Sequence, residues 1–289
     1  MLAATPGAFT LPEPDGPGRG GDCDIGRGRL AVIAGPCVIE TAELCVGVAH
    51  QMRDLCRELG LGYVFKASFD KANRTSLTSP RGPGLERGLA ILAEVRREAG
   101  VPVLTDIHES CQAEAAAAIV DMLQIPAFLA RQTDLLVAAA RTGKPVNLKK
   151  AQFMAPWDVR PAIDKLVDSG CPAVLLTERG VSFGYNTLVV DVRSLPIMRG
   201  FGHPVCLDVT HSMQQPSGLG GQSGATREYA PHLARAAVAA GVDALFIETH
   251  PFPELAQSDA AAQLPLSEMR GLLQQVAALH RALKQCQTT

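Results

Sequence analysis

The stretch LAVIAGPC, residues 30–37, is a short apolar run that ends in glycine, proline and cysteine. Apolar runs of this length, rich in β-branched residues, predict buried β-strands. A helical pattern follows it, because Leu44, Val48 and Met52 fall on one helix face and Gly60 is suited to end the helix. The stretch and its continuation therefore predict one strand–helix unit.

The same alternation recurs along the chain. Eight apolar runs are candidate strands: 30–36, 63–69, 103–107, 122–125, 146–149, 173–177, 205–209 and 245–249. Eight strand–helix units in about 250 residues are the signature of a closed (β/α)₈ barrel. A doubly wound open sheet is the alternative, but it normally has fewer strands, and no GxGxxG follows the first run. We therefore expect an α/β protein with a (β/α)₈ TIM-barrel fold.

Residues 1–29 differ from the rest of the chain. They are rich in glycine, proline and alanine and lack apolar periodicity. Such a segment predicts a flexible N-terminal extension with no chemistry of its own. The barrel, and with it the catalytic domain, is accordingly expected over residues 30–289 as a single domain.

Composition excludes several classes of protein. The 289 residues carry a formal net charge of -2, and lysine and arginine do not form blocks, which argues against binding to nucleic acid or to a membrane surface. No apolar run reaches the roughly 18 residues that span a bilayer. Eight scattered cysteines without a CxxC pair indicate free thiols in a reducing cytoplasm.

Polar residues follow every predicted strand, and the carboxyl ends of barrel strands meet at one rim. Six cations are expected on or near that rim: Lys66, Lys71, Arg74, Lys149, Arg179 and Arg227. Any one of them alone could be a solvated surface residue. Together they would repel one another unless an anionic ligand, a phosphate or a carboxylate, lay between them. The sequence therefore predicts a rim that binds phosphate-bearing substrates.

Four potential metal ligands come from neighbouring strand ends and the loop beyond: Cys37, His211, Glu248 and Asp259. One thiolate, one imidazole and two carboxylates suit a divalent transition metal such as Zn²⁺, Fe²⁺ or Mn²⁺. Taken singly, Cys37 would be interpreted as a buried inert thiol and His211 as a hydrogen-bonded histidine. Their combination favours a metal site.

Several longer motifs resemble one enzyme family. They are AGPC at 34–37, FKASFDKANRTS at 65–76, RGPGLE at 81–86, QIPAFLARQTDL at 124–135, VNLKKAQF at 146–153 and ETHP at 248–251. In this order they resemble the 3-deoxy-D-manno-octulosonate 8-phosphate synthases, and the resemblance extends from residue 30 to beyond residue 266.

This resemblance implies a transferase of lipopolysaccharide biosynthesis. Phosphoenolpyruvate would condense with D-arabinose 5-phosphate and water to give 3-deoxy-D-manno-octulosonate 8-phosphate and inorganic phosphate. In the family, C3 of phosphoenolpyruvate attacks the sugar aldehyde, water adds at C2, and phosphate leaves by C–O cleavage. In the family, the sugar-phosphate site also lies close to a neighbouring subunit. The resemblance therefore implies a homo-oligomer, and we expect a homotetramer in the cytoplasm.

The matching motifs also assign residues to the substrates. The expected phosphoenolpyruvate ligands are Lys66, Ser68, Lys71, Gln124, Lys149 and Arg179. Asn73, Arg74 and Thr75 are expected to hold the sugar and its phosphate, and Thr75 stands where most relatives have a serine. The candidate catalytic residues are Lys66, Asp106, Lys149 and His211.

Cys37 indicates the class within the family. Metal-dependent members have cysteine after Gly-Pro, and metal-independent members have asparagine. The chain therefore resembles the metal-dependent class, in which His211, Glu248 and Asp259 match the other ligands. Zn²⁺, Fe²⁺, Mn²⁺ and Co²⁺ are all candidates, because these ligands do not select one of them.

Two other functions stay open. A 3-deoxy-D-arabino-heptulosonate 7-phosphate synthase uses a four-carbon sugar phosphate on the same barrel, but usually has Lys-Pro-Arg-Thr where this chain has KANR at 71–74. Asn73 therefore favours the five-carbon sugar. A catalytically silent phosphate-binding barrel is the second alternative. It should have lost at least one rim residue, yet every expected position is filled.

Overall fold

The computed structural model describes residues 5–14, 22–74, 76–216 and 224–286. Their main feature is a closed barrel of eight parallel strands: β3 (Ala31–Gly35), β4 (Gly62–Lys66), β5 (Val103–Asp106), β6 (Met122–Ile125), β7 (Val146–Lys149), β8 (Val174–Glu178), β11 (Val205–Asp208) and β14 (Ala244–His250). Each strand pairs with the next along the chain, and β14 pairs with both β11 and β3, which closes the sheet. The predicted fold is confirmed, and each predicted strand is present.

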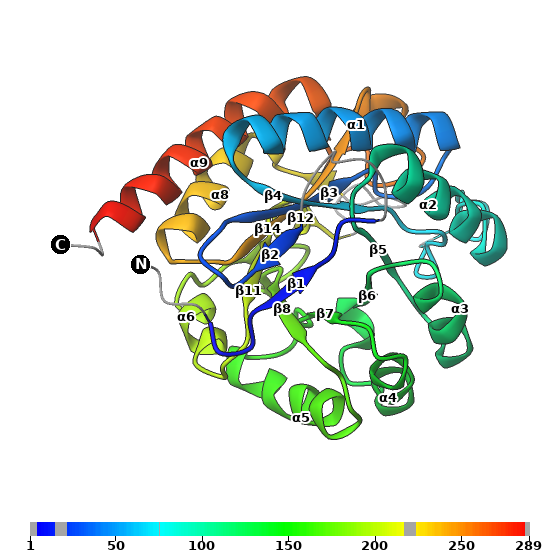
Figure 1. The fold of residues 1–289 in the computed structure, drawn as a ribbon, viewed down its shortest axis with the longest axis horizontal. Coiled ribbons are helices and arrows are strands. Elements are labelled where there is room, and N and C mark those ends of the chain that lie inside the picture. The colour runs from blue at the N-terminus through cyan, green and yellow to red at the C-terminus, as the bar shows by residue number, and fades with distance from the viewer. Residues whose placement is uncertain (1–4, 15–21, 75, 217–223, 287–289) are drawn as a thin grey trace.

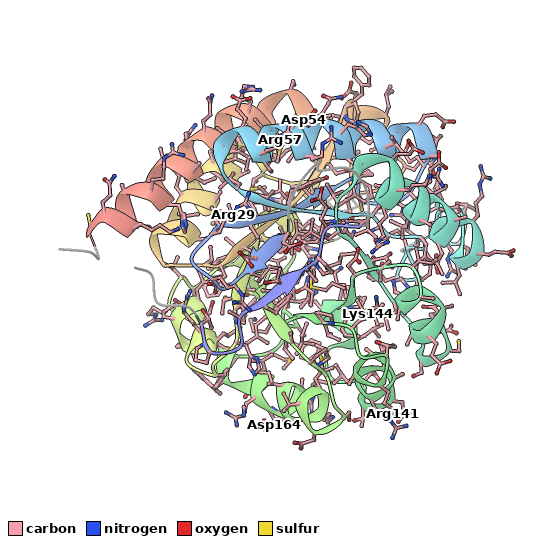
Figure 2. All side chains as sticks on the ribbon, viewed as in Figure 1. Arg29, Asp54, Arg57, Arg141, Lys144 and Asp164 are labelled. Carbon is pink, nitrogen blue, oxygen red and sulfur yellow. The ribbon has the colours of Figure 1, made fainter. Side chains whose placement is uncertain are left out.

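Helices surround the barrel (Figure 1). They are α1 (Ala42–Leu59), α2 (Leu85–Ala99), α3 (Ala113–Ala117), α4 (Thr133–Arg141), α5 (Arg160–Asp168), α6 (Ser194–Arg199), α7 (Val209–Ser212), α8 (Ala230–Ala239) and α9 (Met269–Cys286). Helix α1 ends as predicted, with Gly60 in the left-handed region at φ 73°. Charged side chains on the outer helices, such as Arg57 and Arg141, lie away from the barrel (Figure 2).

The remaining elements are short. Two-residue strands lie in the described loops: β9 (Val181–Ser182), β10 (Leu188–Val189), β12 (Gln214–Gln215), β13 (Gly224–Ala225) and β15 (Leu264–Pro265). The same part of the chain forms 3₁₀ turns: η1 (Ser110–Gln112), η2 (Ala127–Leu129), η3 (Pro156–Val159), η4 (Arg227–Tyr229), η5 (Pro253–Leu255) and η6 (Leu266–Glu268). No helix within the described ranges is both long and apolar enough to cross a membrane.

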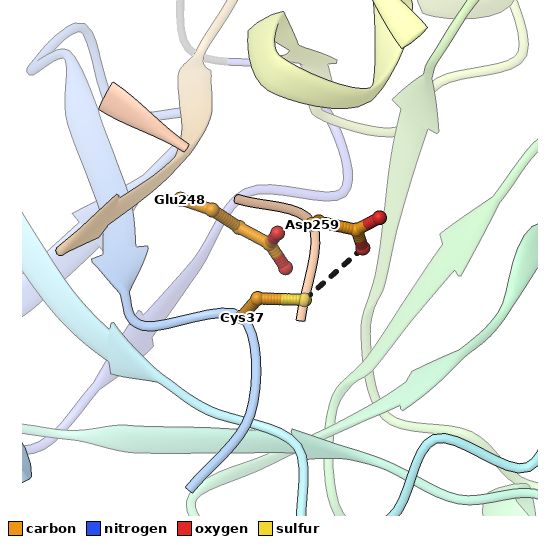
Figure 3. A group of neighbouring side chains, drawn as sticks. All are labelled: Cys37, Glu248 and Asp259. Carbon is orange, nitrogen blue, oxygen red and sulfur yellow. Dashed lines mark hydrogen bonds between the residues drawn. The ribbon is translucent and has the colours of Figure 1, made fainter. Parts of the chain in front are cut away.

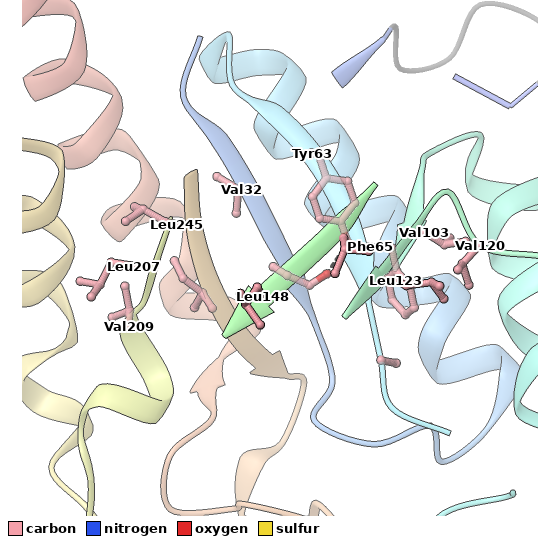
Figure 4. Packing of buried hydrophobic residues seen from close by; sticks show 14 of the residues in the cluster. Val32, Tyr63, Phe65, Val103, Val120, Leu123, Leu148, Leu207, Val209 and Leu245 are labelled. Carbon is pink, nitrogen blue, oxygen red and sulfur yellow. Dashed lines mark hydrogen bonds between the residues drawn. The ribbon is translucent and has the colours of Figure 1, made fainter. Parts of the chain in front are cut away.

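The hydrophobic core has two parts. The larger lies between the strands and the helices, where Val32 and Leu245 of the barrel belong to the same cluster as Met52 of α1 (Figure 4). The smaller lies inside the barrel and includes Leu104 and Phe246. Apolar side chains on both faces of each strand are expected for a parallel sheet, and they explain why the strands are continuous apolar runs.

The N-terminal segment differs from the prediction of a flexible extension. Within its described parts, β1 (Phe9–Leu11) pairs antiparallel with β2 (Cys23–Ile25). The hairpin packs its buried side chains against the inner core and lies across the barrel in Figure 1. Three-residue strands are too short to produce a recognisable periodicity, which explains the difference. The domain boundary at residue 30 stays a prediction.

Close packing of α2 against the barrel gives a stability test. A Cβ added at Gly88 of α2 would lie 2.3 Å from the Cβ of Phe69, whereas a Cβ added at Gly47 of α1 would meet no atom within 4 Å. Because alanine has the higher helix propensity, replacing either glycine by alanine should by itself raise the free energy of unfolding by up to about 1 kcal/mol. Overpacking should cost about 1–3 kcal/mol at Gly88. In denaturant unfolding, we expect Gly88→Ala to be less stable than wild type and Gly47→Ala more stable; equal stability of the two variants would contradict this packing.

Candidate active site

Charged residues at the carboxyl ends of the strands point into a buried cluster. Lys66, Asp106, Lys149, Asp208 and Glu248 are all buried, although they carry full charges. Buried charges are tolerated only when they are paired and hydrogen-bonded. Their pairing therefore determines the geometry of the site.

Lys66 is the centre of one group of contacts. Its Nζ donates to Glu248 Oε1 at 3.0 Å, to Ser68 Oγ at 2.9 Å and to the backbone carbonyl of Cys37 at 3.2 Å. Ser68 Oγ in turn donates to Asp106 Oδ1 at 2.5 Å and accepts from Lys71 Nζ at 3.0 Å. The structure thus brings three of the predicted phosphoenolpyruvate ligands together with the predicted catalytic residue Asp106.

The cations keep the carboxylates of this group ionised. Burial raises the pKa of Glu248 and of Asp106 and is the largest single effect on each, but the neighbouring cations, Lys66 first and Lys71 with it, together hold the pKa of both carboxyls well below the usual range. A hydrogen bond from His108, whose Nε2 lies 3.1 Å from Asp106 Oδ2, acts in the same direction. The carboxylates therefore stay negative over the whole physiological pH range.

Lys149 belongs to a second group, built around Asp208. Its Nζ lies 2.6 Å from Asp208 Oδ2 and 3.7 Å from the centre of the Phe246 ring. Asp208 Oδ2 also lies 2.8 Å from His211 Nδ1, and Asp208 Oδ1 accepts from the His211 backbone N–H at 2.9 Å. Burial lowers the pKa of Lys149, and the Asp208 carboxylate opposes that effect. Lys149 and His211, both predicted catalytic residues, thus share one carboxylate.

Asp208 lies at the centre of this second group, although sequence reasoning assigned it no role. The signal that could have found it is its position, at the end of β11 and three residues before His211, where an aspartate caps the next helix. Its two carboxylate oxygens do more than cap the helix, because they also contact Lys149 and the His211 ring.

Arg179 and Gln124 lie on neighbouring parts of the rim. Arg179 donates from one guanidinium nitrogen to Gln214 Oε1 at 3.1 Å, while its other terminal nitrogen, Nη1, is buried without a hydrogen-bond partner among the described residues. Gln124 Oε1 accepts from Asn147 Nδ2 at 3.0 Å, which fixes the orientation of its amide. An unsatisfied buried guanidinium nitrogen is costly, so the site is suited to an anionic ligand at this point.

Two of the three predicted sugar-phosphate residues, Asn73 and Arg74, lie outside this buried cluster. Asn73 is exposed, and the half-buried Arg74 donates to the backbone carbonyls of Pro80 at 2.7 Å and Gln257 at 3.2 Å. Thr75 falls outside the described residues. Arg227, predicted near the rim, is exposed in η4.

Three of the four predicted metal ligands form a compact group. One ligand atom each from Cys37, Glu248 and Asp259 lies within 4.8 Å of the others (Figure 3). Cys37 Sγ lies 3.1 Å from Asp259 Oδ2, although the two residues are 222 positions apart in the chain. His211 lies beside this group rather than in it, with its Nε2 3.8 Å from Glu248 Oε2.

The chemistry of this group fits a divalent transition metal. Glu248 Oε2 is buried and has no hydrogen-bond partner among the described residues. Burial and then the Glu248 carboxylate raise the pKa of the Cys37 thiol well above its ordinary value. A bound cation would reverse that effect and satisfy the carboxylate, because thiolate and carboxylate are its preferred ligands. His211 Nδ1 faces Asp208, a contact that typically orients a metal-binding histidine and leaves Nε2 available.

Comparison with known proteins agrees with this geometry. Residues 11–285 match the model of the DAHP synthetase I family. The chain belongs to this family. Among its relatives is the 2-dehydro-3-deoxyphosphooctonate aldolase of Cyanothece sp. (strain PCC 7425 / ATCC 29141), which is 57% identical over 91% of this chain and 96% of the relative.

Two further relatives of the DAHP synthetase I family have the same name. The enzyme of Brucella ovis is 56% identical over 88% of this chain and 92% of its own length. That of Nitratidesulfovibrio vulgaris (strain DP4) is 57% identical over 87% of this chain and 92% of its own length. 2-Dehydro-3-deoxyphosphooctonate is 3-deoxy-D-manno-octulosonate 8-phosphate, so the resemblance inferred from the motifs is confirmed.

The metal group gives a prediction that does not depend on activity. We expect Cys37→Ala to bind Zn²⁺ or Fe²⁺ at least about tenfold more weakly than wild type, because the thiolate is the one soft ligand of the group. Cys45→Ala is the matched control, since Cys45 is equally buried but lies on α1. Elemental analysis of the purified proteins measures the effect. Equal metal contents in the two variants would contradict a ligand role for Cys37.

Proposed function

We propose that this protein is a metal-dependent 3-deoxy-D-manno-octulosonate 8-phosphate synthase. It condenses phosphoenolpyruvate with D-arabinose 5-phosphate and water, releases inorganic phosphate, and serves lipopolysaccharide biosynthesis. The observation that carries this proposal is the 57% identity over 96% of a relative named 2-dehydro-3-deoxyphosphooctonate aldolase. The cation-rich rim supports it, since the reaction requires two anionic substrates held face to face.

In this proposal, phosphoenolpyruvate binds between the two groups of buried charges. Lys149 and Arg179 hold it from one side, with Gln124 beside them, and Lys66, Ser68 and Lys71 from the other. The unsatisfied Nη1 of Arg179 supports this assignment, because it offers a charge-assisted hydrogen bond that no described residue uses. The cations lower the repulsion between the substrates, so that C3 can approach the sugar aldehyde.

We assign proton transfer at the reacting centre to the candidate catalytic residues, which form two hydrogen-bonded groups. Asp106 and Lys66 are linked through Ser68, and Lys149 and His211 through Asp208. Each group can therefore hold a proton beside the bound substrates or move one along its hydrogen bonds. The metal ion, Zn²⁺, Fe²⁺, Mn²⁺ or Co²⁺, would be held by Cys37, His211, Glu248 and Asp259, and would supply Lewis-acid polarisation of the aldehyde or of water.

The sugar phosphate is proposed to bind farther out, at Asn73, Arg74 and Thr75. Asn73 is exposed in the single chain, so a neighbouring subunit could cover it and complete the sugar-phosphate site. We therefore propose a homotetramer. We also propose that the enzyme acts in the cytoplasm, because none of its eight cysteines forms a disulfide within the described part of the chain.

Arg74 gives a test of the sugar-phosphate assignment. A charge-assisted contact of this kind is worth about 1.5–3 kcal/mol, so Arg74→Ala should raise the KM for arabinose 5-phosphate by roughly 10- to 100-fold. The KM for phosphoenolpyruvate should change little, because Arg74 lies outside the buried cluster. Steady-state kinetics with each substrate varied in turn measures both values. Equal increases in the two KM values would refute the assignment.

Release of inorganic phosphate tests the function itself. We expect release from phosphoenolpyruvate only when arabinose 5-phosphate is present, loss of activity after prolonged chelation, and recovery with Mn²⁺, Fe²⁺ or Co²⁺. A preference for erythrose 4-phosphate would instead support the heptulosonate synthase, and no release with either sugar would support the silent barrel. Full activity in chelator, with no metal found in the protein, would refute the metal proposal alone.

A further inference from the structure

A buried ion pair lies next to two of the proposed phosphoenolpyruvate ligands. Lys150 directly follows Lys149 at the end of β7, and Glu178 directly precedes Arg179 at the end of β8. Lys150 Nζ lies 3.3 Å from Glu178 Oε1, with 0% and 2% of the two side chains exposed. The proposed reaction gives neither member of this pair a role.

The contacts of Lys150 leave it no donor for a substrate. Besides contacting Glu178, its Nζ donates to the backbone carbonyls of Ala151 at 3.2 Å and Met154 at 3.0 Å. An ammonium group has three N–H donors, and all three have partners here. Lys150 is therefore not a further substrate-binding cation. Its side chain instead ties the loop after β7 to the end of β8.

The contacts of Glu178 hold the backbone that carries Arg179. Glu178 Oε1 accepts from the backbone N–H of Arg179 at 2.9 Å and from that of Gly180 at 2.7 Å. Gly180 has φ 86°, in the left-handed region that favours glycine. One carboxylate oxygen thus fixes the direction in which the chain leaves β8, and with it the start of the Arg179 side chain.

We propose that the Lys150–Glu178 pair is a positioning device that sets the spacing between Lys149 and Arg179 for phosphoenolpyruvate; this inference rests on the proposed function. A buried ion pair adds little stability compared with apolar residues of the same volume. A displacement of a substrate-binding group by about 1 Å, in contrast, can cost on the order of 10²-fold in rate. Glu178 also neutralises one of three neighbouring cations, which would otherwise repel one another.

The double variant Lys150→Met/Glu178→Gln tests this role. It leaves no buried charge unpaired, and the Gln amide oxygen can still accept from the two backbone N–H groups. We expect the Kd of phosphoenolpyruvate, measured by calorimetry, and its KM to rise by roughly tenfold or more. The KM for arabinose 5-phosphate should stay at the wild-type value.

The matched control is Arg199→Met/Asp243→Asn. This pair, with Arg199 Nη2 3.1 Å from Asp243 Oδ1, lies at the opposite end of the barrel, and Asp243 likewise accepts a backbone N–H, from Val205 at 2.9 Å. Its removal should leave phosphoenolpyruvate binding unchanged. An equal loss of binding in both double variants would overturn the positioning role, because it would indicate general loosening of the barrel.

The remaining outcomes are also decisive. A folded Lys150→Met/Glu178→Gln enzyme that binds phosphoenolpyruvate like wild type would overturn the inference and leave the proposed function intact. Failure of the wild-type protein itself to bind phosphoenolpyruvate would refute the proposed function instead. If the double variant does not fold, the same measurement on Glu178→Asp decides, because this variant keeps both charges but its shorter side chain draws the carboxylate away from Lys150 and from the two backbone N–H groups.

Discussion

The buried pair of Lys66 and Glu248, whose charged atoms lie 3.0 Å apart, supports the rest of the active site. Burial raises the pKa of Glu248 and of Asp106, and Lys66 is the largest of the charges that lower it. Because Lys66 and its neighbouring cations keep both carboxyls ionised, Glu248 is suited to bind a metal and Asp106 can accept a hydrogen bond from Ser68. The same ammonium group, through its contact with the Cys37 carbonyl, joins the proposed phosphoenolpyruvate site to the metal group.

Closure of the barrel makes this arrangement possible. Strand β14 lies between β11 and β3, so Glu248 is brought next to the residues that follow both neighbours, His211 and Cys37. The cations that we propose to bind the substrates lie on other parts of the rim, at the ends of β4 and β7 and in the loop after β8. An open sheet would leave its first and last strands apart and could not assemble the same group. The N-terminal hairpin packs against the inner core of the barrel.

Sequence reasoning found which residues reach the rim but not how they pair. Strand periodicity identifies the strand end, so Lys66, Lys149 and Glu248 could be placed correctly. It does not show that Lys149 contacts Asp208 at 2.6 Å or that Lys150, one residue later, turns outward to Glu178. Those partners are set by packing between strands that are distant in sequence. The hairpin of β1 and β2 escaped detection for a related reason, since its strands are stabilised by the barrel and not by their own pattern.

If the buried cations hold two anionic substrates for a condensation, the fate of one oxygen atom will show it. Phosphoenolpyruvate labelled with ¹⁸O at the bridging position should be incubated with arabinose 5-phosphate and the enzyme, and the released phosphate analysed by ³¹P NMR. We expect C–O cleavage, so inorganic phosphate should carry the label and should form only when the sugar phosphate is present. Unlabelled phosphate, or labelled phosphate formed without the sugar, would contradict it.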